Sequence, residues 1–228
     1  MPRLQFVSVP SHLQRNAPAV LADGIEETGL SLLSGLARRI GRPDLGGLDL
    51  LDVGCGVRFT QTLINRDLPF ASYTGVEVSR PIVEWLKENV EKHDDRFRFA
   101  HWNVHNPRYN QQAPPMDREE AFPVSGKYDV IMGFSLVTHL APQDTAHIFQ
   151  LARKAVRPAG RLFFSAFCDE GVDDFEDRVP ERPLLQAYYN KRYLEDLLRR
   201  GGWAVLSYEE PSDYIMNSFL CEPVTLPP

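Results

Sequence analysis

Hydrophobic positions along this chain follow two alternating patterns, one typical of buried strands and one typical of amphipathic helices. Short apolar runs bounded by polar or turn residues indicate strands, and apolar residues three or four positions apart indicate helices. The apolar runs predict strands at residues 48–53, 73–78, 97–102, 128–134, 161–167, 203–209 and 217–221. The helical spacing predicts helices at residues 23–40, 59–66, 142–156 and 187–200, and another from residue 81 onward.

Turn-forming residues separate these predicted elements. Gly41 ends the first long helix, Pro81 opens a later one, and Gly201 and Gly202 end the last. The Pro-Ala-Gly segment 158–160 is expected to turn the chain into the fifth strand. Because strands and helices alternate, the predicted fold class is α/β, with a mostly parallel sheet and helices on both faces. A short Pro-Ser-Asp turn joins the last two strands, which predicts an antiparallel hairpin at the sheet edge.

We expect one domain spanning residues 1–228. Within it, residues 1–20 form a polar, proline-containing arm and residues 20–221 form the core fold. Two polar segments, 106–123 and 169–183, are expected to be loops beside the active site. Loops of this length in a compact domain are usually functional, so the arm and the first loop are candidate lids.

Composition and charge place the chain among soluble globular proteins. It has 228 residues, of which 43% are hydrophobic and 25% are charged. The formal net charge of -6 argues against a nucleic-acid partner, since a protein that grips phosphates needs a basic face. No apolar run approaches the length of about 18 residues that a membrane span needs.

The three cysteines, Cys55, Cys168 and Cys221, have no metal-binding spacing. An odd number of cysteines at such positions indicates free thiols in a reducing compartment. The chain begins with a polar arm and not with an apolar signal segment. We therefore expect a cytoplasmic protein.

A glycine turn after the first strand is the first candidate for chemistry. The strand ends in Asp52, and Gly54 and Gly56 follow it. Glycines at such a turn let the backbone approach a ligand that a Cβ would exclude. The second strand ends in Glu77, and in nucleotide-binding α/β folds an acid about 20 residues past the glycines holds the ribose hydroxyls. The pattern predicts an adenosine-containing cofactor.

The residues missing from this turn indicate which cofactor it binds. A dinucleotide site needs a third glycine where Phe59 stands, and the Gly-Lys-Ser/Thr of a P-loop is absent. At this point the chain resembles the class I, Rossmann-like S-adenosylmethionine-dependent methyltransferases. Their first motif, acid-x-Gly-x-Gly-x-Gly, is matched by Asp52, Gly54 and Gly56, while Arg58 replaces the third glycine.

The resemblance implies a seven-stranded sheet with a terminal antiparallel hairpin and S-adenosylmethionine as cofactor. Glu77 would accept both ribose hydroxyls, because a carboxylate can accept two hydrogen bonds in a bidentate way. Val78 would pack against adenine, Asn103 would meet its amino group, and Arg58 could reach the cofactor carboxylate. The predicted cofactor-binding residues are Asp52, Gly54, Cys55, Gly56, Arg58, Glu77, Val78, Asn103, Val104, Phe134 and Ser135.

The segment Phe134 to Leu140 carries a second resemblance. Related methyltransferases have a similar aromatic-Ser-x-x-Thr-His-Leu run after the fourth strand. His139 in this run is the candidate general base, because an alcohol acceptor holds its proton tightly and an imidazole can take it. His105, just past the third strand, is the reserve candidate.

The predicted function is transfer of a methyl group to a hydroxyl of a small metabolite, with a sugar or glycoside as one acceptor class. An N- or carboxyl-methyltransferase and a catalytically inactive cofactor-binding protein stay open as alternatives. No metal ligands are assigned, although the acidic loop 169–183 leaves a divalent cation such as Mg²⁺ open. The oligomeric state is also open, with a homodimer as one alternative.

Overall fold

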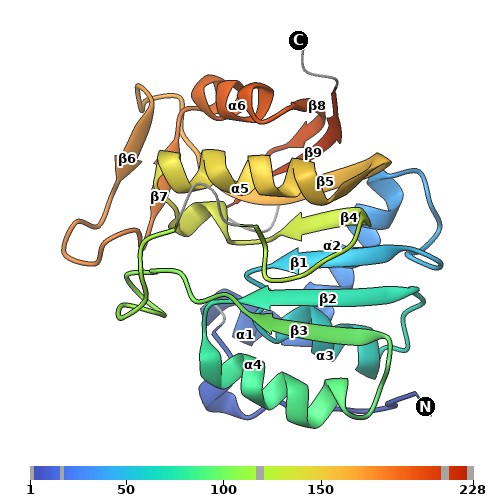
Figure 1. Cartoon of the computed structure of the whole chain (residues 1–228). Helices are drawn as coiled ribbons and strands as arrows, with labels where there is room; N and C mark the ends of the chain where they lie inside the picture. Colours follow the sequence, from blue (N-terminus) through green and yellow to red (C-terminus); the bar gives the residue numbers. More distant parts are fainter. Residues whose placement is uncertain (1–2, 16–17, 117–120, 212–215, 225–228) are drawn as a thin grey trace. The chain divides into compact units, whose positions relative to one another are not determined.

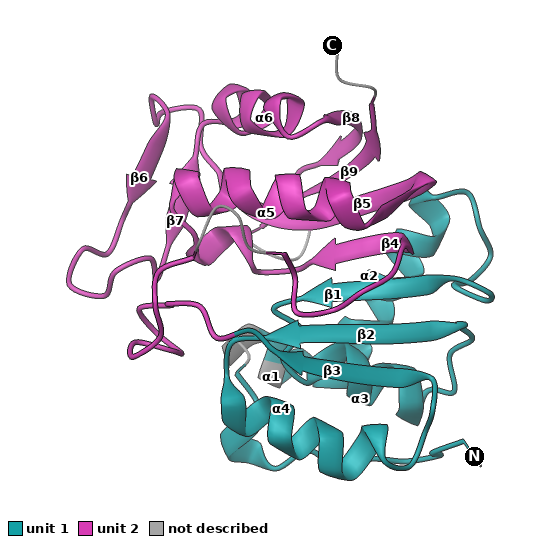
Figure 2. Cartoon of the chain, viewed as in Figure 1, with its two compact units in different colours: residues 1–102 teal, residues 103–228 magenta. Residues whose placement is uncertain are grey.

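The computed structural model describes residues 3–15, 18–116, 121–211 and 216–224 (Figure 1). The chain divides into two compact units, residues 1–102 and residues 103–228 (Figure 2). The expected single domain stays a prediction, and each unit is described by itself.

The first unit contains three parallel strands with β2 in the middle. Strand β1 pairs with β2, with Val53 opposite Val76, and β2 pairs with β3, with Glu77 opposite His101. The described elements of this unit are η1 (Ser11–Leu13), α1 (Pro18–Asp23), α2 (Ile25–Arg39), β1 (Asp49–Val53), α3 (Arg58–Asn65), β2 (Ser72–Glu77), α4 (Arg80–Leu86), a π-helical turn η2 (Lys87–Glu91) and β3 (Phe97–His101).

Burial explains why these strands form where the apolar runs predicted them. Leu50 and Leu51 in β1 are both fully buried, as expected for a parallel strand covered on both faces. Tyr73 and Phe97 from the neighbouring strands are also fully buried, and their rings are 5.6 Å apart. The core of the first unit therefore lies around the middle of its three strands.

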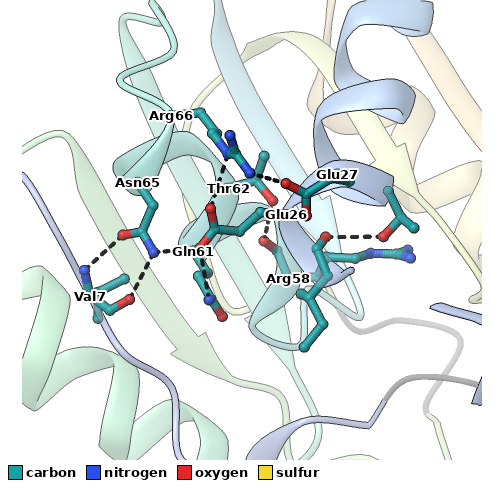
Figure 3. Close-up of polar contacts among 10 residues, drawn as sticks. Val7, Glu26, Glu27, Arg58, Gln61, Thr62, Asn65 and Arg66 are labelled. Atoms are coloured by element: carbon teal, nitrogen blue, oxygen red, sulfur yellow. Dashed lines mark hydrogen bonds and ion pairs between the residues drawn. The ribbon is translucent and has the colours of Figure 1, made fainter. Parts of the chain in front are cut away.

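Leu4 and Val7 of the N-terminal arm are hydrogen-bonded to other segments of the first unit. Val7 N donates to Asn65 Oδ1 at 2.8 Å, and Asn65 Nδ2 donates back to Val7 O at 3.0 Å (Figure 3). Leu4 N donates to Asp94 Oδ2 at 3.2 Å. The side chain of Asn65 thus satisfies both backbone groups of Val7, which anchors the arm to α3. Whether the arm acts as a lid stays a prediction.

The second unit is built around the long strand β5. Its described elements are β4 (Tyr128–Gly133), η3 (Val137–His139), α5 (Pro142–Ala155), β5 (Val156–Cys168), β6 (Phe175–Asp177), β7 (Ala187–Tyr189), α6 (Lys191–Arg200), β8 (Trp203–Glu209) and β9 (Asn217–Pro223). Strand β5 pairs in parallel with β4 on one side. On its other side it pairs antiparallel with β9 and, at its end, in parallel with β7.

The α/β pattern and the C-terminal hairpin are confirmed. All seven predicted strands are present, and β8 and β9 form an antiparallel pair. Part of the predicted Pro-Ser-Asp turn between them, residues 212 and 213, lies outside the described residues. Gly202 has a φ of 83° where α6 ends, which only glycine adopts easily.

The predicted start of the last helix at Ala187 is wrong, because Ala187–Tyr189 forms strand β7. Ala187 and Tyr189 are fully buried while Tyr188 between them is half-buried, which is the period of two expected for a strand. The helix α6 begins only after Asn190, whose side chain accepts a hydrogen bond from Arg192 N at 2.9 Å.

Two other predicted loops are partly strands. Strand β6 lies inside the acidic segment 169–183 and pairs antiparallel with β7. The segment 158–160 belongs to β5, which already begins at Val156 opposite Tyr128. The register between β4 and β5 shifts there, so the Pro-Ala-Gly segment is an irregularity within the strand and not a turn before it.

Within the described ranges, none of the helices has the length and apolar composition needed to span a bilayer.

Candidate functional site

The glycine turn after β1 is fastened to the neighbouring strand β2. Gly54 N and Cys55 N both donate to Val76 O, at 2.8 and 3.2 Å. Gly54 and Gly56 have φ values of 74° and 50°, a left-handed backbone conformation that favours glycine. Both glycines that the sequence singled out are therefore required by the shape of this turn.

Glu77 is held by backbone donors from two directions. Gly56 N donates to Glu77 Oε2 at 3.0 Å, and Ser79 N donates to Glu77 Oε1 at 2.9 Å. The side chain is only 7% exposed, so these bonds fix the orientation of a largely buried carboxylate. Each carboxylate oxygen can accept more than one hydrogen bond, so both oxygens can still accept a hydroxyl.

The side chains of Asp52, which precedes the turn, and Cys55, which is within it, are both buried. Tyr73 OH donates to Asp52 Oδ2 at 2.5 Å, and Asp52 is 1% exposed. Burial raises the pKa of Asp52 to about 7, while the hydrogen bond from Tyr73 and the charge of Arg58 oppose this rise. A Cβ on Gly75 would stand 2.7 Å from Cys55 Sγ, so the cysteine packs directly on β2. In this structure Asp52 and Cys55 therefore connect the turn region to β2, through Tyr73 and Gly75.

Arg58 and Val78 flank these residues. Arg58 begins α3, and its guanidinium carbon lies 5.2 Å from the centre of the Phe59 ring. Val78 follows Glu77 and is half-buried, and its carbonyl oxygen lies 3.1 Å from His101 Nε2. Contact of either residue with a cofactor stays a prediction.

The residues after β3 belong to the second unit and form a hydrogen-bonded loop. Asn110 Nδ2 lies 3.3 Å from Asn103 Oδ1 and 3.2 Å from Val104 O, and donates to both. His105 N donates to Pro114 O at 2.6 Å, and the His105 side chain is exposed. The side-chain oxygen Oδ1 of Asn103 is the atom expected to accept a hydrogen bond from the adenine amino group. It already accepts one hydrogen bond, from Asn110 Nδ2.

The segment after β4 is held by serine and threonine hydroxyls. Ser135 has a φ of 55°, which is uncommon for a residue with a Cβ. Ser165 Oγ on β5 accepts a hydrogen bond from Ser135 N at 2.8 Å, and Ser135 Oγ lies 3.2 Å from Thr138 Oγ1. Phe134 beside it is half-buried. A strained residue held by several partners is typical of a functional segment.

His139 ends the short helix η3 and is oriented by a distant carbonyl. Its Nδ1 lies 3.0 Å from Leu184 O and 3.4 Å from Arg108 Nη1. A carbonyl can only accept, so the shorter contact assigns the proton to Nδ1 and leaves Nε2 with a lone pair. Burial lowers the pKa of His139, and the positive charge of Arg108 lowers it further, whereas the Leu184 carbonyl opposes the change. The imidazole is therefore neutral at neutral pH.

A methyltransferase-domain family model matches residues 13–208. This chain belongs to that methyltransferase family. S-adenosylmethionine is the cofactor of the family. Across the matched region, the glycine turn, Glu77 and His139 all lie inside the family domain.

A curated relative and two solved structures agree with this assignment. The chain is 24% identical over 183 residues to a malonyl-[acyl-carrier protein] O-methyltransferase of Acetivibrio thermocellus. This match covers 68% of the chain and 64% of the relative, so the chain spans less than two thirds of the relative's length.

Both solved structures have the same fold as this chain at low sequence identity. One is a S-adenosylmethionine-dependent methyltransferase from Clostridium acetobutylicum, with a TM-score of 0.62 at 13% identity, covering 90% of this chain and 95% of that one. The other is the Burkholderia thailandensis 1,6-didemethyltoxoflavin-N1-methyltransferase, with a TM-score of 0.61 at 15% identity, covering 91% of this chain and 82% of that one. The predicted Rossmann-like fold class is confirmed.

Two carboxylates of the acidic loop 169–183 form ion pairs with one arginine. Asp169 accepts from Gly171 N at 2.8 Å and pairs with Arg178, which also donates to Glu176 at 2.9 Å. Across the residues that the structure describes, no three histidine, cysteine or acidic side chains are grouped as a metal site would require. Asp169 and Glu176 therefore have a structural role in this loop, because both pair with Arg178.

The structure groups the predicted site residues in two sets. Within the first unit, the turn residues and Glu77 are hydrogen-bonded together, with Asp52 buried just before the turn. Within the second unit, Ser135 and His139 lie on one short segment. The cofactor roles of the individual residues stay predictions.

The sequence did not indicate two residues that contact His139, namely Arg108 and Leu184. Arg108 stands in a turn where Asn106 Oδ1 accepts from its backbone N at 3.0 Å, and the Asn-Pro pair does signal a turn. Leu184 is 45 residues from His139 and has an unusual φ of 57°. A bulky apolar residue gives no sequence signal for such a conformation.

Proposed function

We propose that this protein transfers a methyl group from S-adenosylmethionine to a hydroxyl of a small metabolite, with a sugar or glycoside as one acceptor class. Membership of the methyltransferase family supports the reaction. The relatives differ in their acceptors, since one named above is an O-methyltransferase and another an N1-methyltransferase. The choice of a hydroxyl therefore rests on the residues of this chain.

The first unit fits the adenosine part of the cofactor. Among the described residues, nothing lies within 4 Å of the place where a Cβ on Gly56 would stand, so a ligand could approach this backbone closely. Glu77, fixed by Gly56 N and Ser79 N, would hold the ribose hydroxyls. Val78 would pack against the adenine, and Arg58 would reach the cofactor carboxylate. When bound, S-adenosylmethionine supplies a methyl group already activated by the sulfonium.

His139 is the observation that favours a hydroxyl acceptor. A hydroxyl keeps its proton at neutral pH, so methylating it requires a base. His139 is neutral, and its Nδ1 proton is donated to Leu184 O, which directs the lone pair to Nε2. We propose that Nε2 takes the acceptor proton. His105, which is exposed, is the reserve candidate.

Glu77→Ala tests the cofactor site. We expect it to weaken S-adenosylmethionine binding at least about 10-fold, because hydrogen bonds to a charged carboxylate are lost together with the support of Gly56 and Ser79. Isothermal titration calorimetry measures the affinity directly. Glu209→Ala on β8 is the matched control, and an unchanged affinity in Glu77→Ala would refute the ribose role.

His139→Ala tests the base. We expect cofactor affinity to stay nearly unchanged and turnover to fall about 100-fold or more, the usual contribution of a general base. Steady-state kinetics with a hydroxyl acceptor that the natural chain methylates supply the rate. Unaffected turnover would assign His139 a structural role, and would favour the alternative of an amine or carboxylate acceptor, which needs no strong base.

The remaining alternative is a protein that binds the cofactor without catalysis. Two departures from the family pattern support it: Arg58 in place of the third motif glycine, and Asn103 where the family often has an acid. Formation of S-adenosylhomocysteine with any small-molecule acceptor would exclude this alternative. The proposal also includes a cytoplasmic location, which the three free thiols support.

A further inference from the structure

A pocket of about 410 Å³ lies in the second unit between two loops. One loop follows β3 and the other joins β6 to β7. Its volume lies in the range of about 300–1,000 Å³ that is usual for small-molecule sites. The lining residues are Pro107, Arg108, Gln111, Glu181, Arg182, Pro183 and Leu185.

The charges of this pocket are predominantly positive although the whole chain is acidic. Arg108 and Arg182 contribute two guanidinium groups, against the single carboxylate of Glu181. Within the described ranges, neither arginine forms an ion pair. Arg178 on the same β6–β7 loop differs, because Asp169 and Glu176 already pair with it. The two pocket arginines therefore have capacity for an anionic ligand.

The backbone of each arginine lies in a turn that is held by hydrogen bonds. Arg108 N donates to Asn106 Oδ1 at 3.0 Å. Arg182 N donates to Val179 O at 2.8 Å, and Arg182 O accepts from Leu185 N at 3.0 Å. Backbone positions fixed in this way reduce the entropy lost when the side chains bind a ligand.

The pocket adjoins the proposed base. Arg108 Nη1 lies 3.4 Å from His139 Nδ1, and Leu185 in the pocket wall follows Leu184, whose carbonyl oxygen holds the same imidazole. A molecule in this pocket would therefore contact Arg108, which itself contacts the His139 ring on its Nδ1 side.

We propose that this pocket binds an anionic group of the methyl acceptor, a carboxylate or a phosphate, through Arg108 and Arg182. This inference rests on the proposed function, since it names the acceptor class of the same site. Planar guanidinium groups match the oxygens of both anions in bidentate geometry. Gln111 and Glu181 supply polar groups for the neutral part of the acceptor. The acceptor is then a small acid that also carries a hydroxyl.

Three probes of similar size test the pocket: 4-hydroxybenzoate, phenyl phosphate and the neutral 4-hydroxybenzamide. The readouts are isothermal titration calorimetry and the ring carbon-proton NMR signal of His139, assigned with His139→Gln. We expect the anions to bind at millimolar concentrations or below and to shift the His139 signal. The neutral amide should neither bind nor shift the His139 signal. Whichever anion binds tighter identifies the anionic group of the acceptor as a carboxylate or a phosphate.

Arginine variants locate the binding. Arg108→Gln and Arg182→Gln should each weaken anion binding about 10-fold or more, as expected for a lost charge-assisted hydrogen bond. Arg192→Gln on α6 removes the same charge away from the pocket and should leave binding unchanged. Circular dichroism of each variant checks that it folds.

The proposal is overturned if neither anion binds, if the amide binds as tightly as the acids, or if Arg192→Gln weakens binding as much as Arg108→Gln. These titrations contain no S-adenosylmethionine. Their failure would leave methyl transfer intact, whereas a chain that binds the anions but not S-adenosylmethionine would refute the proposed function alone.

Discussion

At the scale of single residues, burial changes the acidity of two groups in opposite directions. The pKa of Asp52 rises to about 7 because the buried carboxylate loses its hydration. The pKa of His139 falls because the imidazolium loses its hydration in the same way. Each shift favours the neutral form, as desolvation requires. His139 is thereby kept in the form that can accept a proton.

Asp52→Asn should stabilise the protein at alkaline pH. The pKa of Asp52 is about 7 in the folded chain. It is near 4 in an unfolded chain, so between these values the folded chain binds more protons. Its free energy of unfolding therefore falls as pH rises through this window. Asparagine does not ionise, so the variant lacks this loss. We therefore expect the free energy of unfolding of the variant, minus that of the natural chain, to be about 1–3 kcal/mol larger at pH 8 than at pH 5.

Urea denaturation of both proteins at the two pH values measures this difference. Asp129→Asn on β4, whose carboxylate is not enclosed in the same way, is the control. A difference between Asp52→Asn and the natural chain that is the same at both pH values would contradict the raised pKa.

At the scale of elements, the first unit depends on close contact between α2 and α3. Glu26 on α2 accepts from Asn65 Nδ2 at 2.8 Å and from Gln61 Nε2 at 3.2 Å, both on α3 (Figure 3). Arg66 just after α3 also donates to Glu26, at 3.0 Å. Asn65 is at the same time the residue that holds the N-terminal arm. This polar cluster joins three segments of the chain.

Two glycines on α2 provide a matched test of this contact. A Cβ on Gly29 would stand 2.1 Å from Thr62 Oγ1, whereas a Cβ on Gly35 would meet only Arg38 Nη2, at 3.8 Å. Gly29→Ala should therefore destabilise the fold by about 1–3 kcal/mol, the usual cost of overpacking. Gly35→Ala should stabilise it by about 0.5–1 kcal/mol, since alanine is the better helix former. Chemical denaturation measures both, and equal effects would show that the helices are not in close contact.

Also at the scale of elements, the local sequence led to a wrong prediction at residues 187–189, where a helix start was expected and strand β7 is found. The Ala-Tyr-Tyr segment before α6 has the composition of a helix start as well as of a strand. Tyr189 OH lies 2.8 Å from Thr145 Oγ1 and donates to Leu140 O at 2.6 Å, both outside its own hairpin. These tertiary contacts, together with pairing to β5 and β6, select the strand.

At the scale of the whole molecule, the proposed reaction should not depend on a metal ion. The carboxylates most suited to a cation, Asp169 and Glu176, already pair with Arg178. Treatment with a chelator followed by gel filtration should leave both S-adenosylmethionine affinity and turnover within about twofold of the untreated protein, a difference below 0.5 kcal/mol. Loss of activity on chelation and recovery with Mg²⁺ would establish a metal requirement.

The sequence by itself determined the seven main strands, the glycine turn and the position of Glu77. These features depend on local patterns: apolar runs long enough for a buried strand, and glycines where the backbone must turn with positive φ. Local sequence constrains them because their physical causes act between near neighbours.

Only the tertiary structure decided which groups surround His139. Its partners, Arg108 and Leu184, are 31 and 45 residues away in the chain. Neither the types of these two residues nor their sequence neighbours indicate that they contact His139. The contacts depend on how β5, β6 and β7 pair and on where the loops between these strands lie. The hydrogen-bonded state of His139, and the cationic pocket that Arg108 lines, therefore follow from packing between distant segments.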